Sequence, residues 1–220
     1  MNSSRAYKRQ SRIITPKELA FPIAVIGAGG IGSWATLALA KMGCSNIAVY
    51  DNDIVEEHNL PSQCFSLSSV GMKKVDALQQ LIQEMTGVDI HAYPQPFQTY
   101  TTTPDVIICA VDSLEQRREI WNILKRPIAP WKLLIDVRMH HNDIRVLLAS
   151  RGAPFSLDQY ERTLDPSRPV DPGKCTERSV IYNTFVCGGM IANFVKKFAK
   201  HERVSLSYTI DLATVSIYHA

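Results

Sequence analysis

Apolar residues in this chain fall into two kinds of stretch, which alternate along its length. Short uncharged runs rich in β-branched residues, such as 23–26 and 105–110, are typical of buried strands. Longer stretches with apolar residues at intervals of three and four, such as 70–85, are typical of amphipathic helices. The pattern predicts strands at 23–26, 46–50, 88–92, 105–110, 133–137 and 143–149, helices at 31–42, 70–85, 114–124 and 180–199, and one or two terminal strands within 204–218.

Strands that alternate with helices predict an α/β fold, Rossmann-like and doubly wound, with a mainly parallel sheet. The link between the fifth and sixth strands, residues 140–142, is short. Such a link favours an antiparallel pair, so we expect the sheet to have an antiparallel C-terminal extension. Residues 151–174 contain four prolines and no clear periodicity, which predicts a long loop.

Composition and charge limit the class of protein to which the chain can belong. The chain has 220 residues, of which 45% are hydrophobic, and a net charge of +3. It is long enough for one large domain, and the charge balance does not point to nucleic acid. No apolar run approaches the roughly 18 residues of a membrane-spanning helix. The N-terminal residues 1–20 are polar and basic, so we expect a basic arm on a cytoplasmic protein with no membrane partner.

The five cysteines are odd in number and include no CxxC pair. A disulfide framework and a structural zinc site are therefore not expected. Most of these cysteines lie among apolar or small residues, which is typical of small core side chains.

A glycine-rich turn follows the first predicted strand in the stretch FPIAVIGAGGIG, residues 21–32. Gly27, Gly29 and Gly32 have the spacing GxGxxG, and Gly30 fills one of the free positions. Glycines at this spacing permit a tight turn, a close approach of the backbone to a phosphate, and close packing of helix on strand. The N–H groups that open the next helix favour an anion, so the stretch predicts a nucleotide site.

Charged residues at three further positions fit such a site. Asp51 ends the second predicted strand, 19 residues after Gly32, where a carboxylate can hold the ribose of a nucleotide. Ser68 and Ser69 are expected to cap the helix at 70–85. Lys74 then falls near the start of this helix, where the helix dipole disfavours a cation unless a phosphate is close. Asp112 follows the fourth strand and is expected to face the same crevice as Asp51.

Four motifs occur in order: GAGGIG, DNDIVEEHNLPSQ, SSVGMKKV and CAVDS. Together they resemble the ThiF/MoeB/HesA superfamily, the adenylating enzymes related to the E1 activators of ubiquitin, over roughly residues 9–199. The resemblance implies a single E1-like adenylation domain over residues 21–220, with a crossover loop at about 151–179. It also implies that ATP and Mg²⁺ are used to adenylate the C-terminal carboxylate of a ubiquitin-like or sulfur-carrier protein.

The resemblance further implies a homodimer, and an E2-like or sulfurtransferase protein downstream. In many members an N-terminal arginine, here Arg9 in YKRQ, reaches across the dimer to the partner's ATP. The other implied site residues are the phosphate-loop glycines Gly27, Gly29, Gly30 and Gly32, the acids Asp51 and Asp53, Asn59, the phosphate-binding Lys74, Asp112 as the Mg²⁺ ligand, and Cys175 as the acceptor of the activated acyl group or a persulfide.

The chain departs from the family pattern in NLPSQ, where Ser62 replaces the arginine expected three residues after Asn59. One phosphate cation is missing unless Lys73, Arg138 or Arg9 takes its place. Cys175 stands in KCTERS, where neighbouring cations lower a thiol pKa, although a single loop cysteine is more often incidental.

Two other interpretations stay open from the residues. An NAD-linked oxidoreductase fits GxGxxG followed by Asp51 equally well, but it leaves Asn59, Lys74 and Asp112 unexplained. A degenerate, non-catalytic relative that binds a partner without adenylating it is favoured by Ser62.

Overall fold

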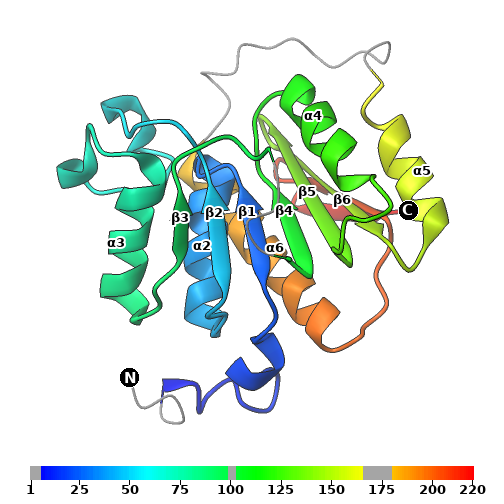
Figure 1. The fold of residues 1–220 in the computed structure, drawn as a ribbon, viewed down its shortest axis with the longest axis horizontal. Helices are drawn as coiled ribbons and strands as arrows, with labels where there is room; N and C mark the ends of the chain where they lie inside the picture. Colours follow the sequence, from blue (N-terminus) through cyan, green and yellow to red (C-terminus); the bar gives the residue numbers. More distant parts are fainter. Residues whose placement is uncertain (1–5, 99–102, 166–179) are drawn as a thin grey trace.

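The computed structural model describes residues 6–98, 103–165 and 180–220, which form one eight-stranded sheet in the order β3-β2-β1-β4-β5-β6-β7-β8 (Figure 1). The strands are β1 Ile23–Ile26, β2 Ile47–Tyr50, β3 His91–Tyr93, β4 Val106–Cys109, β5 Leu133–His140, β6 Asp143–Ser150, β7 Ser207–Asp211 and β8 Ser216–His219. The helices are α2 Gly30–Met42, α3 Lys74–Thr86, α4 Leu114–Leu124, α5 Pro154–Arg162 and α6 Ile181–Ala199.

The strands from β3 to β5 are parallel, and β5 to β8 are joined by antiparallel pairs. This confirms the predicted α/β fold with its antiparallel C-terminal extension. The β5–β6 hairpin closes with His140 opposite Asp143, as the short link predicted. The order reverses at β1, whose neighbours β2 and β4 continue in opposite directions along the sheet, and ligands of doubly wound folds bind at such a point.

Helices cover both faces of the sheet, so its central strands are apolar on both sides (Figure 1). In β1, Ile23 and Val25 face a core shared with α2, α3 and α6, whereas Ala24 and Ile26 face a second core shared with α4 and α5. The period of two along the strand therefore divides the core into two halves. This double burial explains why the strand runs carry no charge and no polar alternation.

Helix α6 lies against α2 because Gly188 leaves room for it. A Cβ at Gly188 would stand 3.1 Å from the backbone carbonyl of Trp34. The Trp34 ring in turn contacts Phe185 edge to face, with 4.3 Å between the centroids. The glycine that weakens the helix in isolation thus permits close packing of two helices.

The structure corrects several boundaries and one loop. Helix α3 begins at Lys74, and Ser68 and Ser69 belong to a separate 3-10 turn, η3 Leu67–Ser69, so they do not cap it. The loop predicted for 151–174 is wrong at its start, where α5 runs for nine residues. Pro154 is the first residue of α5, a position that needs no N–H donor and tolerates proline.

Candidate functional site

A cleft of about 960 Å³ opens at the carboxyl ends of β1, β2, β4 and β5. Its lining comes from the turn after each of these strands and from the helices and strands beside them. The residues that line the strand ends include Ile26, Gly27, Tyr50, Asp51, Ala110, Val111, Asp112, Arg138 and Met139. The cleft therefore lies where the sheet topology places a ligand.

The glycine turn is fixed by contacts that exclude a side chain. Gly27 has φ +96°, and a Cβ there would lie 2.8 Å from the carbonyl oxygen of Ala110. A Cβ on Gly32 would lie only 1.8 Å from the carbonyl oxygen of Gly27. Gly29 is the N-cap of α2 and has no side chain to cap the first turn, so the N–H groups of that turn remain available to an anion at the cleft.

Asp51 braces the glycine turn against the segment that follows β2. Its Oδ2 accepts a hydrogen bond from the backbone N–H of Ala28 at 2.7 Å, and its Oδ1 accepts one from Asp53 at 2.8 Å. Because each carboxylate oxygen has two lone pairs, both oxygens retain capacity for ribose hydroxyls. Asp51 lines the cleft, as the sequence predicted.

Lys74 is the first residue of α3 and is 7% exposed. Its Nζ lies 2.8 Å from Oδ2 of Asp53, whose side chain is 60% exposed. Lys73 instead donates to the carbonyl oxygen of Asn52 at 2.6 Å and is not among the cleft residues. Lys74 therefore presents a nearly buried cation to the cleft, held by a carboxylate that solvent reaches.

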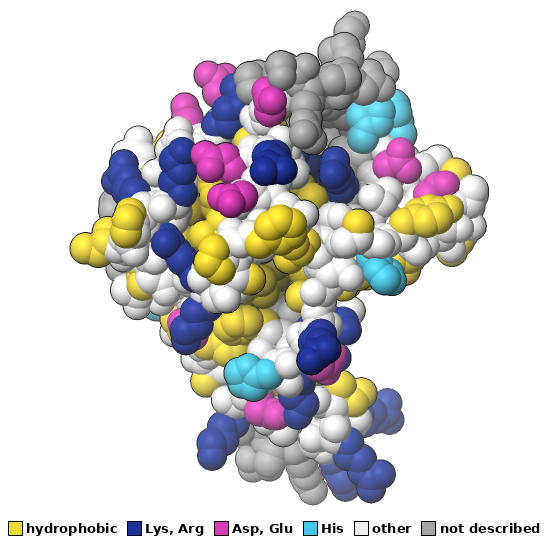
Figure 2. Space-filling view, turned by 90° about the vertical axis from the view of Figure 1, so that its right-hand side faces the viewer, with side chains coloured by type: hydrophobic (Ala, Val, Ile, Leu, Met, Phe, Trp, Pro, Cys, Tyr) yellow, Lys and Arg dark blue, Asp and Glu magenta, His cyan; other side chains and the backbone are white. Residues whose placement is uncertain are grey.

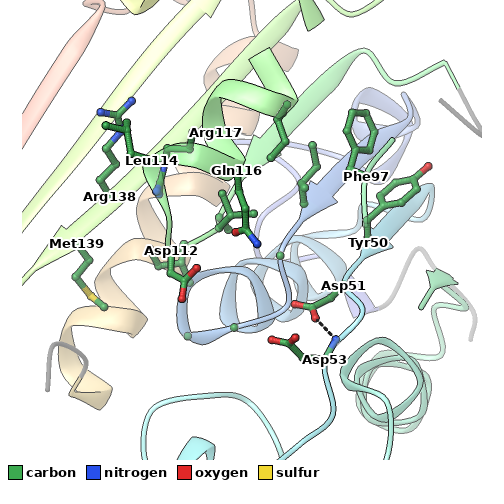
Figure 3. A pocket seen from close by; sticks show the side chains of 18 of the residues that line it. Tyr50, Asp51, Asp53, Phe97, Asp112, Leu114, Gln116, Arg117, Arg138 and Met139 are labelled. Atoms are coloured by element: carbon green, nitrogen blue, oxygen red, sulfur yellow. Dashed lines mark hydrogen bonds between the residues drawn. The ribbon is translucent and has the colours of Figure 1, made fainter. Parts of the chain in front are cut away.

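Asp112 follows β4 and lines the same cleft. The carboxylates of Asp51, Asp53 and Asp112 surround a common space beside the glycine turn (Figure 3). Mg²⁺ prefers oxygen ligands and is commonly held by one or two carboxylates together with substrate phosphates. The donor set suits Mg²⁺ in that form, although no cluster of three or more metal-ligating side chains is formed within the described ranges.

Two predicted site residues lie elsewhere. Asn59 is buried and ends the 3-10 turn η2 Glu57–Asn59, where its Oδ1 accepts from the N–H of Glu56 at 3.0 Å. It is not among the cleft residues, whereas the nearby Gln63 is. Arg9 is exposed on the N-terminal arm and also lies outside the cleft lining. Cys175 lies outside the described residues.

Ser62, which replaces the motif arginine, is 6% exposed. Its carbonyl oxygen accepts a hydrogen bond from the indole Nε1 of Trp34 at 2.9 Å. Among the three cations considered as substitutes for the missing arginine, Arg138 is the one that lines the cleft.

A buried ion-pair network, which the sequence analysis missed, holds Arg138 in this wall. Asp136 is fully buried, with Nε of Arg117 2.9 Å from Oδ1 and Nη2 of Arg138 2.8 Å from Oδ2. Tyr160 donates to Oδ2 at 3.1 Å, and Arg138 also donates to Thr163 at 3.0 Å. The network joins α4, β5 and the end of α5.

Burial alone would raise the pKa of Asp136, but the charges of Arg117 and Arg138 more than offset it and lower that pKa. Burial raises the pKa of Tyr160 well above its ordinary value, and the charge of Asp136 raises it further. A charged residue within the otherwise apolar strand LLIDV was the sequence signal for this site.

Part of the cleft lining is apolar. Its side chains belong to the core cluster under α4 and are Ile26, Tyr50, Phe97, Val111, Leu114 and Ile120. The cleft thus offers an apolar surface beside its charged groups, an arrangement that suits the base and the phosphates of a nucleotide.

The space-filling view shows cations and carboxylates on the side of the molecule where the antiparallel strands lie, with apolar atoms exposed between them (Figure 2). None of the described helices is long and apolar enough to cross a membrane.

This chain is similar to a known family and to several known proteins. The model of the ThiF family matches residues 16–209. A ubiquitin-like modifier-activating enzyme 5 of Arabidopsis thaliana is 29% identical over 122 residues, 46% of this chain and 28% of its own. The adenylyltransferase and sulfurtransferase UBA4 of Candida glabrata is 36% identical over 74 residues, 33% of this chain and 17% of its own. The chain thus spans less than a third of either relative.

Among solved structures, E. coli MccB crystallised with ATP has a TM-score of 0.74 against this chain. The match covers 100% of this chain and 71% of that one at 18% identity. At this identity the likeness is one of fold.

Proposed function

Because the chain belongs to the ThiF family, we propose that its cleft binds ATP with Mg²⁺ and adenylates the C-terminal carboxylate of a protein or peptide. A carboxylate oxygen of the acyl substrate attacks the α-phosphorus of ATP, and the bond from that phosphorus to the pyrophosphate oxygen breaks. The products are an acyl-adenylate and pyrophosphate. The observation that carries this proposal is the convergence of the glycine turn, Asp51, Lys74 and Asp112 on one cleft.

The proposed roles follow from charge. The first turn of α2 and Lys74 bind the phosphates, and Asp51 holds the ribose. Asp112 is the proposed ligand of Mg²⁺, which would neutralise charge on the leaving pyrophosphate. No strong base is required, because the nucleophile is already a carboxylate, so positioning and charge stabilisation carry the reaction.

The pair between Lys74 and Asp53 suggests how the charge of the lysine is balanced before a phosphate binds. A phosphate oxygen replaces Oδ2 of Asp53 as the partner of the Lys74 ammonium. Asp53 then turns to solvent at small cost, because its side chain is already 60% exposed. The nearly buried lysine is thereby never left without a counter-charge.

The acyl substrate in this proposal is a ubiquitin-like or sulfur-carrier protein, consistent with the names of the relatives. An E2-like or sulfurtransferase protein would act downstream, and Cys175 would take the activated acyl group as a thioester, with release of AMP, or would receive the sulfane sulfur of a sulfurtransferase persulfide. We further propose a cytoplasmic homodimer in which Arg9 reaches the ATP of the partner subunit, and in which Arg138 supplies the cation that Ser62 does not.

ATP–pyrophosphate exchange with a candidate carrier tests the proposal. Asp112→Ala is expected to lower exchange about 100-fold, the typical effect of removing one group that stabilises developing charge. The matched control is Glu115→Ala, on an exposed position of α4 outside the cleft lining, which is expected to retain exchange. Full exchange in Asp112→Ala, with its melting temperature unchanged, would contradict the metal role.

Thermal shift separates the rival functions. ATP with Mg²⁺ is expected to raise the melting temperature, and NAD is not, because a ligand stabilises the fold only if it binds the native state. A larger shift with NAD would favour an oxidoreductase. A shift with ATP but no exchange with any carrier would favour a non-catalytic relative.

A further inference from the structure

The apolar part of the cleft lining has polar groups beside it on α4. Gln116 and Glu119 both line the cleft from α4, three residues apart and therefore on one face of the helix. Ile120 completes this face and belongs to the apolar cluster beneath it. The side-chain amide of Gln116 extends from the first turn of α4 into the cavity (Figure 3).

Both side chains are available to a ligand. Gln116 uses its backbone N–H to bond Oγ of Ser113, the N-cap of α4, and this bond holds the first turn in place. Neither the Gln116 amide nor the Glu119 carboxylate forms a hydrogen bond or an ion pair with another described residue. A rigid helix thus carries two polar groups over an apolar surface.

The two groups differ in hydrogen-bonding character. An ionised carboxylate only accepts, whereas an amide both donates and accepts in one plane. Adenine presents an amine donor beside a ring-nitrogen acceptor, while guanine and hypoxanthine present a carbonyl oxygen where adenine has the amine. A carboxylate attracts that amine and repels that carbonyl oxygen.

We propose that Gln116 and Glu119 are the specificity-determining residues of the nucleotide site and select adenine over 6-keto purines. This inference rests on the proposed ATP site, in which the first turn of α2 and Lys74 bind the phosphates and Asp51 holds the ribose, so that the apolar part of the lining is left for the base. The base then lies against Leu114 and Ile120, with its polar edge toward Gln116 and Glu119.

Binding of ATP and ITP, measured by isothermal titration calorimetry with Mg²⁺, tests the inference. The two nucleotides share ribose and triphosphate and differ at position 6 of the base and in the protonation of N1. The wild-type protein is expected to bind ATP about 10- to 100-fold more tightly than ITP. Glu119→Gln is expected to bring this ratio toward one, because the new amide donates to the carbonyl oxygen.

The complementary variant is Gln116→Glu, which presents two acceptors and is expected to weaken ATP binding about tenfold. Glu115→Gln, a charge-matched change on the same helix outside the cleft lining, is expected to leave the ATP-to-ITP ratio unchanged. Equal binding of ATP and ITP by the wild type would overturn the inference and leave the ATP site intact. Equal ratios in Glu119→Gln and Glu115→Gln would also overturn it. Failure to bind either nucleotide would overturn the proposed function as well.

Discussion

Replacing Asp136 by asparagine is expected to destabilise the protein by about 3–5 kcal/mol, the usual cost of breaking a buried ion pair by removing one partner. Asp136 is fully buried, and its two oxygens serve Arg117, Arg138 and Tyr160 at 2.8 to 3.1 Å. Asparagine keeps one acceptor oxygen, but it directs an NH₂ donor at groups that are themselves donors. Arg117, which is 5% exposed, is then left charged and without a carboxylate.

The pH dependence gives this prediction a second readout. The pKa of Asp136 is lowered in the folded state, so its contribution to stability is present above its unfolded pKa of about 3.9 and is lost as the pH falls through the folded value. The difference in free energy of unfolding between wild type and Asp136→Asn should therefore be constant near neutral pH. It should shrink below about pH 4.

Urea unfolding followed by tryptophan fluorescence measures both effects. Trp121 is a local probe, because its ring centroid lies 4.8 Å from that of Tyr160. The matched control is Asp158→Asn at an exposed position of α5, where a change within about 0.5 kcal/mol is expected. A loss below about 1 kcal/mol in Asp136→Asn, or a difference that does not change in acid, would refute the view that this network stabilises the fold.

Three further predictions concern the turn, the cation and the thiols. Gly32→Ala should lower the free energy of unfolding by about 3 kcal/mol because its Cβ meets the Gly27 carbonyl, whereas Gly29→Ala, with open space around it, should change it by less than about 0.5 kcal/mol in the same urea assay. Lys74→Ala should weaken ATP binding about 10- to 100-fold in calorimetry, since a hydrogen bond to a charged group is lost. Lys73→Ala should leave ATP binding unchanged, and equal losses in the two variants would contradict the assignment of Lys74 as the phosphate-binding lysine. Burial raises the pKa of the described thiols to about 12, so iodoacetamide at pH 8 should leave them unmodified in the native protein, as mass spectrometry would show; they are Cys44, Cys64, Cys109 and Cys187.

The order and type of most elements could be predicted from the sequence because they depend on local properties. Buried strands such as β1 and β4 are short, uncharged and β-branched, and α4 shows helical spacing at the predicted bounds 114–124. Helix α5 was missed because it has few apolar residues and begins with a proline. Proline usually interrupts a helix, but it is tolerated in the first turn, where Pro154 lies. Local pattern also placed the start of α3 four residues early.

Within the site, the sequence identified residues that follow directly from a local motif or from the end of a strand. The glycine turn and Asp51 follow from sterics and from strand ends that a parallel sheet aligns. Lys74 and Asp112 were predicted from a helix start and a strand end, the resemblance implied their roles, and both line the cleft. Asn59 lies outside the cleft lining and its carboxamide oxygen binds the backbone of its own turn, so its role in nucleotide binding stays a prediction.

Only the tertiary structure decided how distant charges compensate one another. Asp136 and Arg117 are 19 residues apart, and Lys74 and Asp53 are 21 apart, yet each pair meets within 3 Å. Periodicity reports which face of an element is buried, but a buried charge is tolerated only where another element supplies its partner. The sequence alone therefore determined the strands, most of the helices and the phosphate turn. The packing of α4, β5 and α5 determined which charges line the cleft and which are buried beneath it.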